Sequence, residues 1–341
     1  MDTKTSCTLV DGCSYGRDLT PSSIGFIIFV FAGIFLTWLI LGRFKKDYWK
    51  RFLIMAIGIL IFEVFTAPMW HNFHLGRFAY VYKDVSWILN LGWTSLILGT
   101  VLLVDKLLPK LKQWQKYIVE LTILTPIIFL LQIWEVNIGV RGFAQETLQA
   151  TSGLRLFNVP VEGLYYAPVF SGLVIAFYKY WALTLDKVPL MPVIKRNLWR
   201  TFIIALVGVF AFELLVNPMV ENKNFPSWSY IYQDISMLLT GLWIFGLWLS
   251  DFLIQKWFIN LETLFRFCIA VFINTILAIP LELFFITNQF RIYSGSTINN
   301  FSGYYVFGGN LAVEILFAIP CYLALIISFV RYFETILDNE F

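Results

Sequence analysis

Long runs of apolar residues alternate along the chain with shorter polar segments. Each run is long enough to cross ~30 Å of hydrocarbon as a helix. The pattern predicts an all-α polytopic membrane protein of about nine transmembrane helices, at residues 23–41, 52–70, 85–103, 117–136, 159–181, 202–220, 235–254, 264–286 and 305–332. The first run ends in a basic cluster and not in a small-residue cleavage site, so we expect a retained span and no signal peptide.

Charged residues between the runs predict the orientation. The connections after the first, third, fifth and seventh runs carry fifteen Lys and Arg residues, whereas the opposite side carries eight over a greater total length. By the positive-inside rule the N-terminus is extracytoplasmic and the acidic C-terminal tail is cytoplasmic. An odd number of spans agrees with termini on opposite sides.

One stretch of the chain occurs twice. Residues 62–86 and 212–236 share nine of 25 positions at a constant offset of 150, including Glu63 and Glu213 inside apolar runs. Such self-similarity indicates an internal duplication. Four prolines are expected to end or kink their helices, namely Pro68, Pro168, Pro218 and Pro320.

The match continues through the rest of each copy. Glu162 aligns with Glu314 at an offset of 152, and an offset of 147 places Glu135 opposite Glu282. Asp105 aligns with Asp251 at 146, which implies four residues fewer in the second copy. A four-helix unit returns the chain to its starting side, so the two copies are predicted to be parallel. The predicted parts are a tail at 1–22, an extra helix at 23–43, repeats at 51–184 and 199–333, and a tail at 334–341.

Three pairs of carboxylates lie in the predicted membrane segments. With the orientation above, all of them fall in the outer half of the bilayer. A charge inside a membrane is costly, so these groups are expected to be protonated or paired and available for proton transfer. The alternative is that some are only interhelical hydrogen-bond partners. The candidate catalytic residues are Glu63, Glu135, Glu162, Glu213, Glu282 and Glu314.

Aromatic side chains cluster near these carboxylates. An apolar, aromatic-lined cavity with a few acids suits a hydrophobic substrate that becomes cationic, because ring faces stabilise cations. The same rings can instead be packing or interfacial residues. The candidate substrate-binding residues are Tyr82, Trp134, Tyr165, Tyr166, Tyr232, Phe284 and Phe285.

Composition excludes several classes of protein. With 59% hydrophobic and only 14% charged residues, the chain is not a soluble globule. The net charge of +3 is spread over loops, so no nucleic-acid partner is expected. Four cysteines and two histidines lack zinc-site spacing, and we expect neither a metal nor a cofactor. Cys7 and Cys13 can form a disulfide if the N-terminal tail lies in an oxidising compartment.

Two segments resemble lycopene cyclase domains of the small, membrane-embedded type. The first runs from Val159 to Tyr166, preceded by Trp134-Glu135 and Gly142-Phe143, and the second runs from Ile279 to Phe285. Both resemble the family's Pro-Leu-Glu-Glu-x-Phe-Phe signature, with Gly163 and Leu283 in place of the second glutamate. The resemblance implies closure of ionone rings on a linear carotenoid by protonation of a double bond, without net redox change. Related fungal membrane cyclases use acid residues on prenylated substrates.

These observations favour a cofactor-independent cyclase or isomerase of a long isoprenoid lipid. Glu162 is the expected general acid, with Glu135 and Glu282 as its candidate partners. If the repeats pack around one site, Glu162 and Glu282 supply its two carboxylates. The first alternative is a proton-coupled transporter or channel, made less favourable by the nearly apolar inner halves of the second, fourth, sixth and eighth runs. The second alternative is a membrane scaffold; the oligomeric state stays open.

Overall fold

The computed structural model describes residues 16–43, 47–186, 198–258 and 260–338. The disulfide prediction for Cys7 and Cys13 lies outside these ranges. Within them the molecule is a bundle of nine long apolar helices, which confirms a polytopic membrane protein. The long helices are α1 (Pro21–Leu41), α2 (Tyr48–Thr66), α3 (Trp87–Leu107), α4 (Gln113–Asn137), α6 (Gly163–Leu185), α7 (Leu198–Val216), α8 (Met237–Trp257), α9 (Thr263–Thr287) and α11 (Val313–Asp338).

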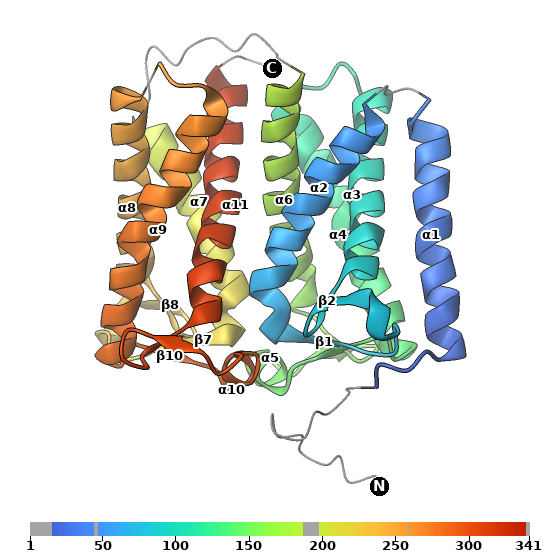
Figure 1. Ribbon diagram of the computed structural model, residues 1–341. Coiled ribbons are helices and arrows are strands. Elements are labelled where there is room, and N and C mark those ends of the chain that lie inside the picture. The colour runs from blue at the N-terminus through green and yellow to red at the C-terminus, as the bar shows by residue number, and fades with distance from the viewer. Residues whose placement is uncertain (1–15, 44–46, 187–197, 259, 339–341) are drawn as a thin grey trace, which may run out of the picture.

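Short strands and helical turns gather at one end of the bundle, which we call the hairpin end (Figure 1). The antiparallel pairs are β1 (Trp70–Asn72) with β4 (Arg141–Phe143), β2 (Tyr80–Tyr82) with β3 (Val85–Ser86), β5 (Arg155–Leu156) with β6 (Val159–Pro160), β7 (Val220–Asn222) with β10 (Arg291–Tyr293), β8 (Tyr230–Tyr232) with β9 (Ile235–Ser236), and β11 (Tyr305–Val306) with β12 (Leu311–Ala312). The short helices are α5 (Gln145–Gln149), α10 (Gly295–Asn299), η2 (Ala67–Met69), η3 (Arg77–Ala79), η4 (Asn217–Met219) and η5 (Ser227–Ser229).

Helices α1, α3, α6 and α8 end at the opposite end of the bundle, where α2, α4, α7 and α9 begin, so the described residues that flank the predicted cytoplasmic connections share that end (Figure 1). Helix α1 starts at the hairpin end and α11 finishes at the opposite end, as an odd number of spans requires. Which end faces the cytoplasm stays a prediction from the positive-inside rule.

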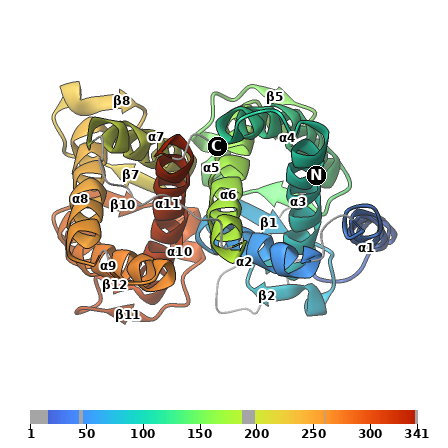
Figure 2. The same cartoon turned by 90° about the horizontal axis from the view of Figure 1, so that it is seen from above.

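The same order of elements occurs twice, in a first half from α2 to α6 and a second half from α7 to α11. Figure 2 shows the halves side by side, with α6 against α11 and with α1 outside, against α3. From α2 to β5 each element returns in the second half 150 residues later with the same length, and the offset becomes 152 at β6 and β12. A common origin of the halves stays an inference from the sequence.

This register corrects two predicted correspondences. Because α4 and α9 keep an offset of 150, the counterpart of Glu282 is Gln132, and Glu135 matches Phe285. Helices α3 and α8 also keep it, so Asp251 matches Val101 and the predicted loss of four residues is wrong. Glu135 and Glu282 differ by about one helical turn, which leaves both on the same face of their helices.

Some predicted helix limits are also wrong. The apolar run at 305–332 contains the β11–β12 hairpin, and its helix begins only at Val313. The same helix extends to Asp338, so Glu334 belongs to the bundle and not to a tail. Its carboxylate is buried and accepts hydrogen bonds from Arg331 and Thr201.

Close helix contacts in each half use a glycine. A Cβ atom on Gly58 of α2 would lie 2.8 Å from the Phe177 ring of α6. In the second half a Cβ atom on Gly208 of α7 would lie 3.0 Å from the Phe329 ring of α11. Small residues allow helices to approach closely in membranes, where van der Waals packing drives their association. One cluster of buried apolar residues spans both halves, which pack against each other through α6 and α11.

Candidate functional site

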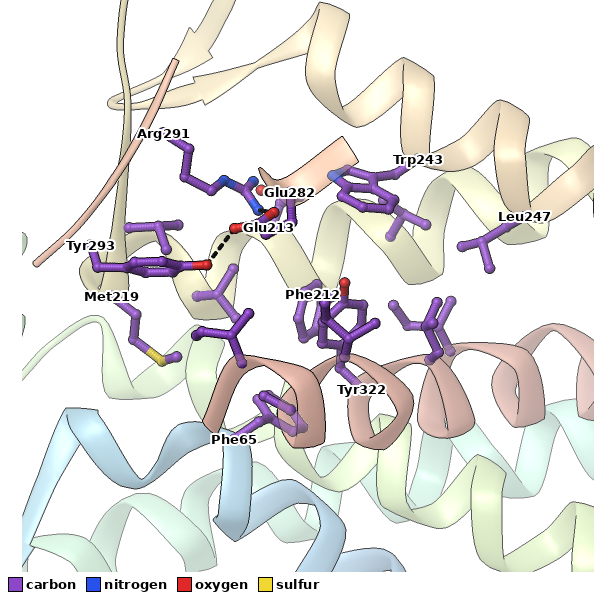
Figure 3. A pocket seen from close by; sticks show the side chains of 18 residues that line it. Phe65, Phe212, Glu213, Met219, Trp243, Leu247, Glu282, Arg291, Tyr293 and Tyr322 are labelled. Carbon is purple, nitrogen blue, oxygen red and sulfur yellow. Dashed lines mark hydrogen bonds and ion pairs between the residues drawn. The ribbon is translucent and has the colours of Figure 1, made fainter. Parts of the chain in front are cut away.

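A cavity lies beside the β7–β10 strand pair, lined by residues of the second half and by Phe65 of α2 (Figure 3). It has about 80 Å³ of space open to the centres of water-sized spheres. One water needs ~10–15 Å³ by the same measure, so the cavity is larger than a single solvent site. Apolar and aromatic side chains make up most of its wall. Its polar wall consists of Glu213 from α7, Glu282 from α9, Arg291 and Tyr293 from β10, and Tyr322 from α11.

The shape of the chain near Pro218 helps to form this cavity. As predicted for Pro68 and Pro218, α2 ends at Thr66 and α7 ends at Val216, each followed by one 3-10 turn. Pro168 and Pro320 do not end a helix and lie inside α6 and α11. The freed carbonyl of Met219 accepts hydrogen bonds from the backbone of Ser294 at 3.0 Å and from the hydroxyl of Thr297 at 2.9 Å. These bonds fix the β10–α10 segment against the end of α7 and so place β10 beside the cavity.

Glu282 is held as a paired carboxylate. Arg291 Nη1 donates to Glu282 Oε2 at 2.9 Å, and the Tyr293 hydroxyl donates to Oε1 at 2.5 Å. Arg291 Nε also donates to Asn222 Oδ1 at 3.1 Å. Burial lowers the pKa of Arg291, but the negative charges of Glu282 and Glu213 outweigh this effect and raise it. Both carboxylate oxygens of Glu282 therefore accept a hydrogen bond, one from a guanidinium and one from a phenol.

Glu213 has a different environment on the same cavity wall. Its side chain is buried, and its carboxyl receives no hydrogen bond from any residue that the structure describes. Arg291 and Glu282 lie within electrostatic reach. An anion without hydrogen-bond donors is costly in apolar surroundings. Two carboxylates in unlike settings therefore face one apolar cavity.

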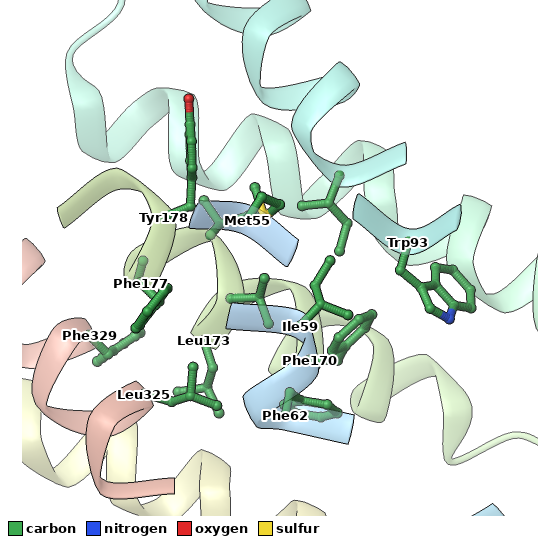
Figure 4. Packing of buried hydrophobic residues seen from close by; sticks show 14 of the residues in the cluster. Met55, Ile59, Phe62, Trp93, Phe170, Leu173, Phe177, Tyr178, Leu325 and Phe329 are labelled. Atoms are coloured by element: carbon green, nitrogen blue, oxygen red, sulfur yellow. The ribbon is translucent and has the colours of Figure 1, made fainter. Parts of the chain in front are cut away.

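The first half has a smaller cavity at the equivalent place, of about 30 Å³. Phe62, Trp93 and Phe170 lie together at its edge (Figure 4), with the Phe170 ring centroid 4.6 Å from Phe62 and 5.8 Å from Trp93. Its polar wall includes Glu63, Gln132 and Arg141. Glu63 Oε2 is buried without a hydrogen-bond partner.

Three positions carry a carboxylate or a tyrosine hydroxyl in the second half and an uncharged side chain without a hydroxyl in the first half. At the places of Glu282, Tyr293 and Tyr322 the first half has Gln132, Phe143 and Phe170. The first half instead pairs Arg141 with Glu135 at 3.4 Å, and the Arg141 guanidinium lies over the Trp70 ring at 4.4 Å. Of these two cavities, the one in the second half therefore has two carboxylates and two tyrosine hydroxyls in its wall, whereas the first-half cavity is lined by Glu63 as its one carboxylate and by Tyr166.

Glu162 and Glu314 hold loops at the hairpin end. The backbone N–H of Ser152 donates to Glu162 Oε1 at 2.6 Å, and that of Ser302 donates to Glu314 Oε1 at 2.5 Å. The Tyr82 hydroxyl donates to the same Glu314 oxygen at 3.0 Å. Neither glutamate is among the lining residues of the cavity that contains Glu282.

The setting of Glu162 does not suit the general acid expected from the sequence. Burial raises the pKa of Glu162, but the hydrogen bonds from Ser152 outweigh burial and lower it. A carboxyl with a lowered pKa is ionised near neutral pH and holds no proton to donate. The structure thus places Glu162 and Glu282 in different local settings, and the model of a shared site has no support from the cavities.

The predicted aromatic residues are also distributed over several places. Tyr166 lines the first cavity and lies beside Tyr165, with ring centroids 4.5 Å apart. Trp134 packs against Phe26 and Phe29 of α1, at ring distances of 5.4 and 5.0 Å. It lines a third cavity, of about 180 Å³, between α1, α3 and α4.

The other four predicted aromatic residues lie away from the second-half cavity. Phe284 is exposed, and Phe285 packs against Phe225 and Phe290. Tyr82 and Tyr232 are exposed on the corresponding strands β2 and β8. None of the four is among the lining residues of that cavity.

Sequence reasoning missed the cationic and phenolic partners of the site. Arg141 and Arg291 are two of the eight cations of the predicted outer side, and the sequence analysis does not assign them to the site. They match at the 150-residue offset that relates Glu63 to Glu213. That conserved spacing was the available signal. Tyr293 and Tyr322 give no such signal, because the first half has phenylalanine at both places.

Buried charges also lie toward the opposite end of the bundle. Lys179 Nζ donates to Glu120 Oε1 at 2.7 Å between α6 and α4, and both side chains are buried. Arg331 of α11 forms ion pairs with Asp251 and Glu334. The expectation of an almost wholly apolar inner half is therefore wrong for α4.

Loss of a loop-holding carboxylate gives a testable effect on stability. Glu162→Ala is expected to cost about 1.5–3 kcal/mol, because it removes the charged acceptor of the hydrogen bond from the Ser152 N–H. A lowered pKa stabilises the fold above the unfolded-state pKa, and this stabilisation is lost as pH falls through the folded-state pKa. The difference in melting temperature from wild type should therefore shrink in acid. A difference that grows in acid would contradict this assignment, and Arg155→Ala on the exposed β5 is the control.

Comparison of the chain with models of protein families, with curated proteins and with solved structures finds no match.

Proposed function

We propose that the second-half cavity is the acid–base site of a membrane-embedded, cofactor-independent cyclase or isomerase acting on a long isoprenoid-like lipid. One observation carries the proposal: Glu213 and Glu282 face the same apolar cavity in unlike electrostatic settings. Pairs of titratable groups in contrasting environments are typical of acid–base catalysis. A hydrophobic lipid dissolves in a membrane, which the nine long apolar helices of the described residues are long enough to cross, and this supports a lipid as substrate.

Each side chain has a distinct role in the proposed reaction. Glu213, without hydrogen-bond donors, carries the proton and adds it to a carbon–carbon double bond. A neighbouring double bond attacks the carbocation and closes a ring through a new carbon–carbon bond. The Glu282 carboxylate, held by Arg291 and Tyr293, removes a proton from the adjacent carbon and leaves a new double bond. Atoms and electrons balance, and the product is an isomer of the substrate.

Aromatic rings supply the remaining requirement, which is stabilisation of the carbocation. Phe212, Trp243 and Tyr322 line the cavity near the carboxylates (Figure 3). Ring faces stabilise a desolvated cation by ~2 kcal/mol or more. Each positioned proton transfer contributes ~10²–10⁴-fold to the rate. The segment around Glu282 is also one of the two that resemble lycopene cyclase domains, which supports the isoprenoid class of substrate.

Expression in a lycopene-accumulating cell tests the proposal. We expect the wild-type chain to change the carotenoid pigment, and Glu213→Gln and Glu282→Gln to abolish the change while the protein still folds. Glu63→Gln, at the equivalent place of the first half, is the matched control and should keep most of the activity. An unchanged pigment with well-folded wild-type protein would exclude the carotenoid substrate.

A proton-coupled carrier is the second candidate, favoured by the buried ion pairs of Glu120 and of Arg331 toward the opposite end. Membrane carriers place such groups along ion pathways. A carrier predicts solute uptake into proteoliposomes that requires a proton gradient, and the enzyme predicts a chemically altered lipid without uptake.

A further inference from the structure

A fourth cavity lies along the same helices as the site. It has about 20 Å³ of space open to the centres of water-sized spheres, enough for one water. Thr201 and Asp251 supply polar groups to its wall. Leu247 of α8 and Ile326 of α11 line both this cavity and the larger one that contains Glu213. The two cavities therefore meet at the same two apolar side chains.

Titratable groups lie in or next to the wall of each cavity. Around Glu213 they are Glu282, Arg291, Tyr293 and Tyr322. Beyond the shared residues, Asp251 pairs with Arg331, and Arg331 Nη1 lies 3.1 Å from Glu334. The hydroxyl of Thr201 donates to Glu334 at 2.6 Å, and Arg200 pairs with Asp338 at the end of α11. Tyr180 and Arg266 lie within electrostatic reach of this cluster.

We propose that the second half contains a gated proton route, which connects Glu213 with the end of the bundle opposite the hairpins. Waters in the two cavities carry the proton, and the Leu247–Ile326 pair is the gate between them. Apolar constrictions close such routes by excluding water, and side-chain motion opens them. This route does not depend on the proposed lipid chemistry.

The first half differs at each of these places. Ile97 and Val174 match the gate residues and are fully buried. Val101 stands at the place of Asp251, and Arg51 at that of Thr201. A route of the proposed kind therefore belongs to the second half, and substitutions in the first half serve as matched controls.

Proton flux into proteoliposomes tests the route without a lipid substrate. The full chain is reconstituted with a pH-sensitive dye inside, and valinomycin with potassium compensates charge. We expect Leu247→Ala to accelerate proton entry several-fold over wild type, and Ile97→Ala to leave it unchanged. Adding Glu213→Gln to Leu247→Ala should return the flux to the wild-type level, and adding Asp251→Asn should lower it.

A smaller substitution at the other gate residue separates an effect on the gate from a folding defect. Ile326→Val removes one methylene from the gate, with Val174→Ala as its control, and should also raise the flux. Equal flux in the gate variants, their controls and wild type would overturn the proposal. An increase in Leu247→Ala that survives Glu213→Gln would equally overturn it, because the leak would then bypass the carboxylate. Either outcome leaves the pigment experiment unaffected, so the two proposals fail independently.

Discussion

Arg291→Met is expected to destabilise the protein by about 3–5 kcal/mol, because the substitution leaves the buried Glu282 without its guanidinium partner. Both side chains are at most 10% exposed, so bulk solvent replaces little of the lost pairing. The hydrogen bond from Arg291 Nε to Asn222 is lost as well. The melting temperature of the purified protein in one detergent gives the measurement.

A double variant separates loss of the ion pair from loss of packing. Arg291→Met with Glu282→Gln has no buried anion to compensate and should recover part of the lost stability. Arg141→Met is the matched control in the first half, where the contact to Glu135 is longer at 3.4 Å. A single Arg291 variant as stable as wild type, or a double variant less stable than the single one, would contradict this account.

Lys179→Met is the second large effect, again about 3–5 kcal/mol, because Glu120 is fully buried and would lose its cation. Glu120→Gln combined with Lys179→Met removes both charges and should restore much of the stability. The result would show that this pair contributes to the core between α4 and α6.

The control for this variant is a more exposed pair in the same half. Lys116 pairs with Asp105 at 3.1 Å, and the Asp105 side chain is 33% exposed. Partial exposure lets solvent screen the charge that remains, so Lys116→Met should cost less than Lys179→Met. Equal losses from the two variants would show that burial does not decide the strength of these pairs.

The helices could be predicted because length and hydropathy decide them. A run of about 20 apolar residues must form a helix in lipid, where each backbone polar group needs a partner within the segment. The ends of the helices are harder to predict where other parts of the protein pack over the chain. Tyr305–Ala312 is apolar enough to extend a predicted span, but its strands pair at the hairpin end. The charge of Glu334 led to the prediction of a tail, whereas hydrogen bonds from Arg331 and Thr201 hold its side chain inside the bundle.

The candidate site was predicted only in part. Glu213 and Glu282 could be found because a carboxylate in an apolar run is unusual. Their partners Arg291 and Tyr293 come from a strand after α9, and no local pattern predicts that this strand folds back beside the helices. Glu162 has equally apolar neighbours in sequence, but its carboxylate accepts a hydrogen bond from the backbone N–H of Ser152. Tertiary hydrogen bonding, invisible in the sequence, separates these two kinds of glutamate.

Transfer of solvent deuterium to a lipid product tests the central claim most directly. The full chain in lipid nanodiscs is incubated with lycopene in heavy water, and the carotenoids are analysed by mass spectrometry. If Glu213 protonates a double bond and Glu282 removes a proton, each newly closed ring carries one deuterium, and folded Glu213→Gln protein gives none. Cyclised lipid without deuterium, or equal labelling by wild type and Glu213→Gln, would contradict acid–base catalysis in the second-half cavity.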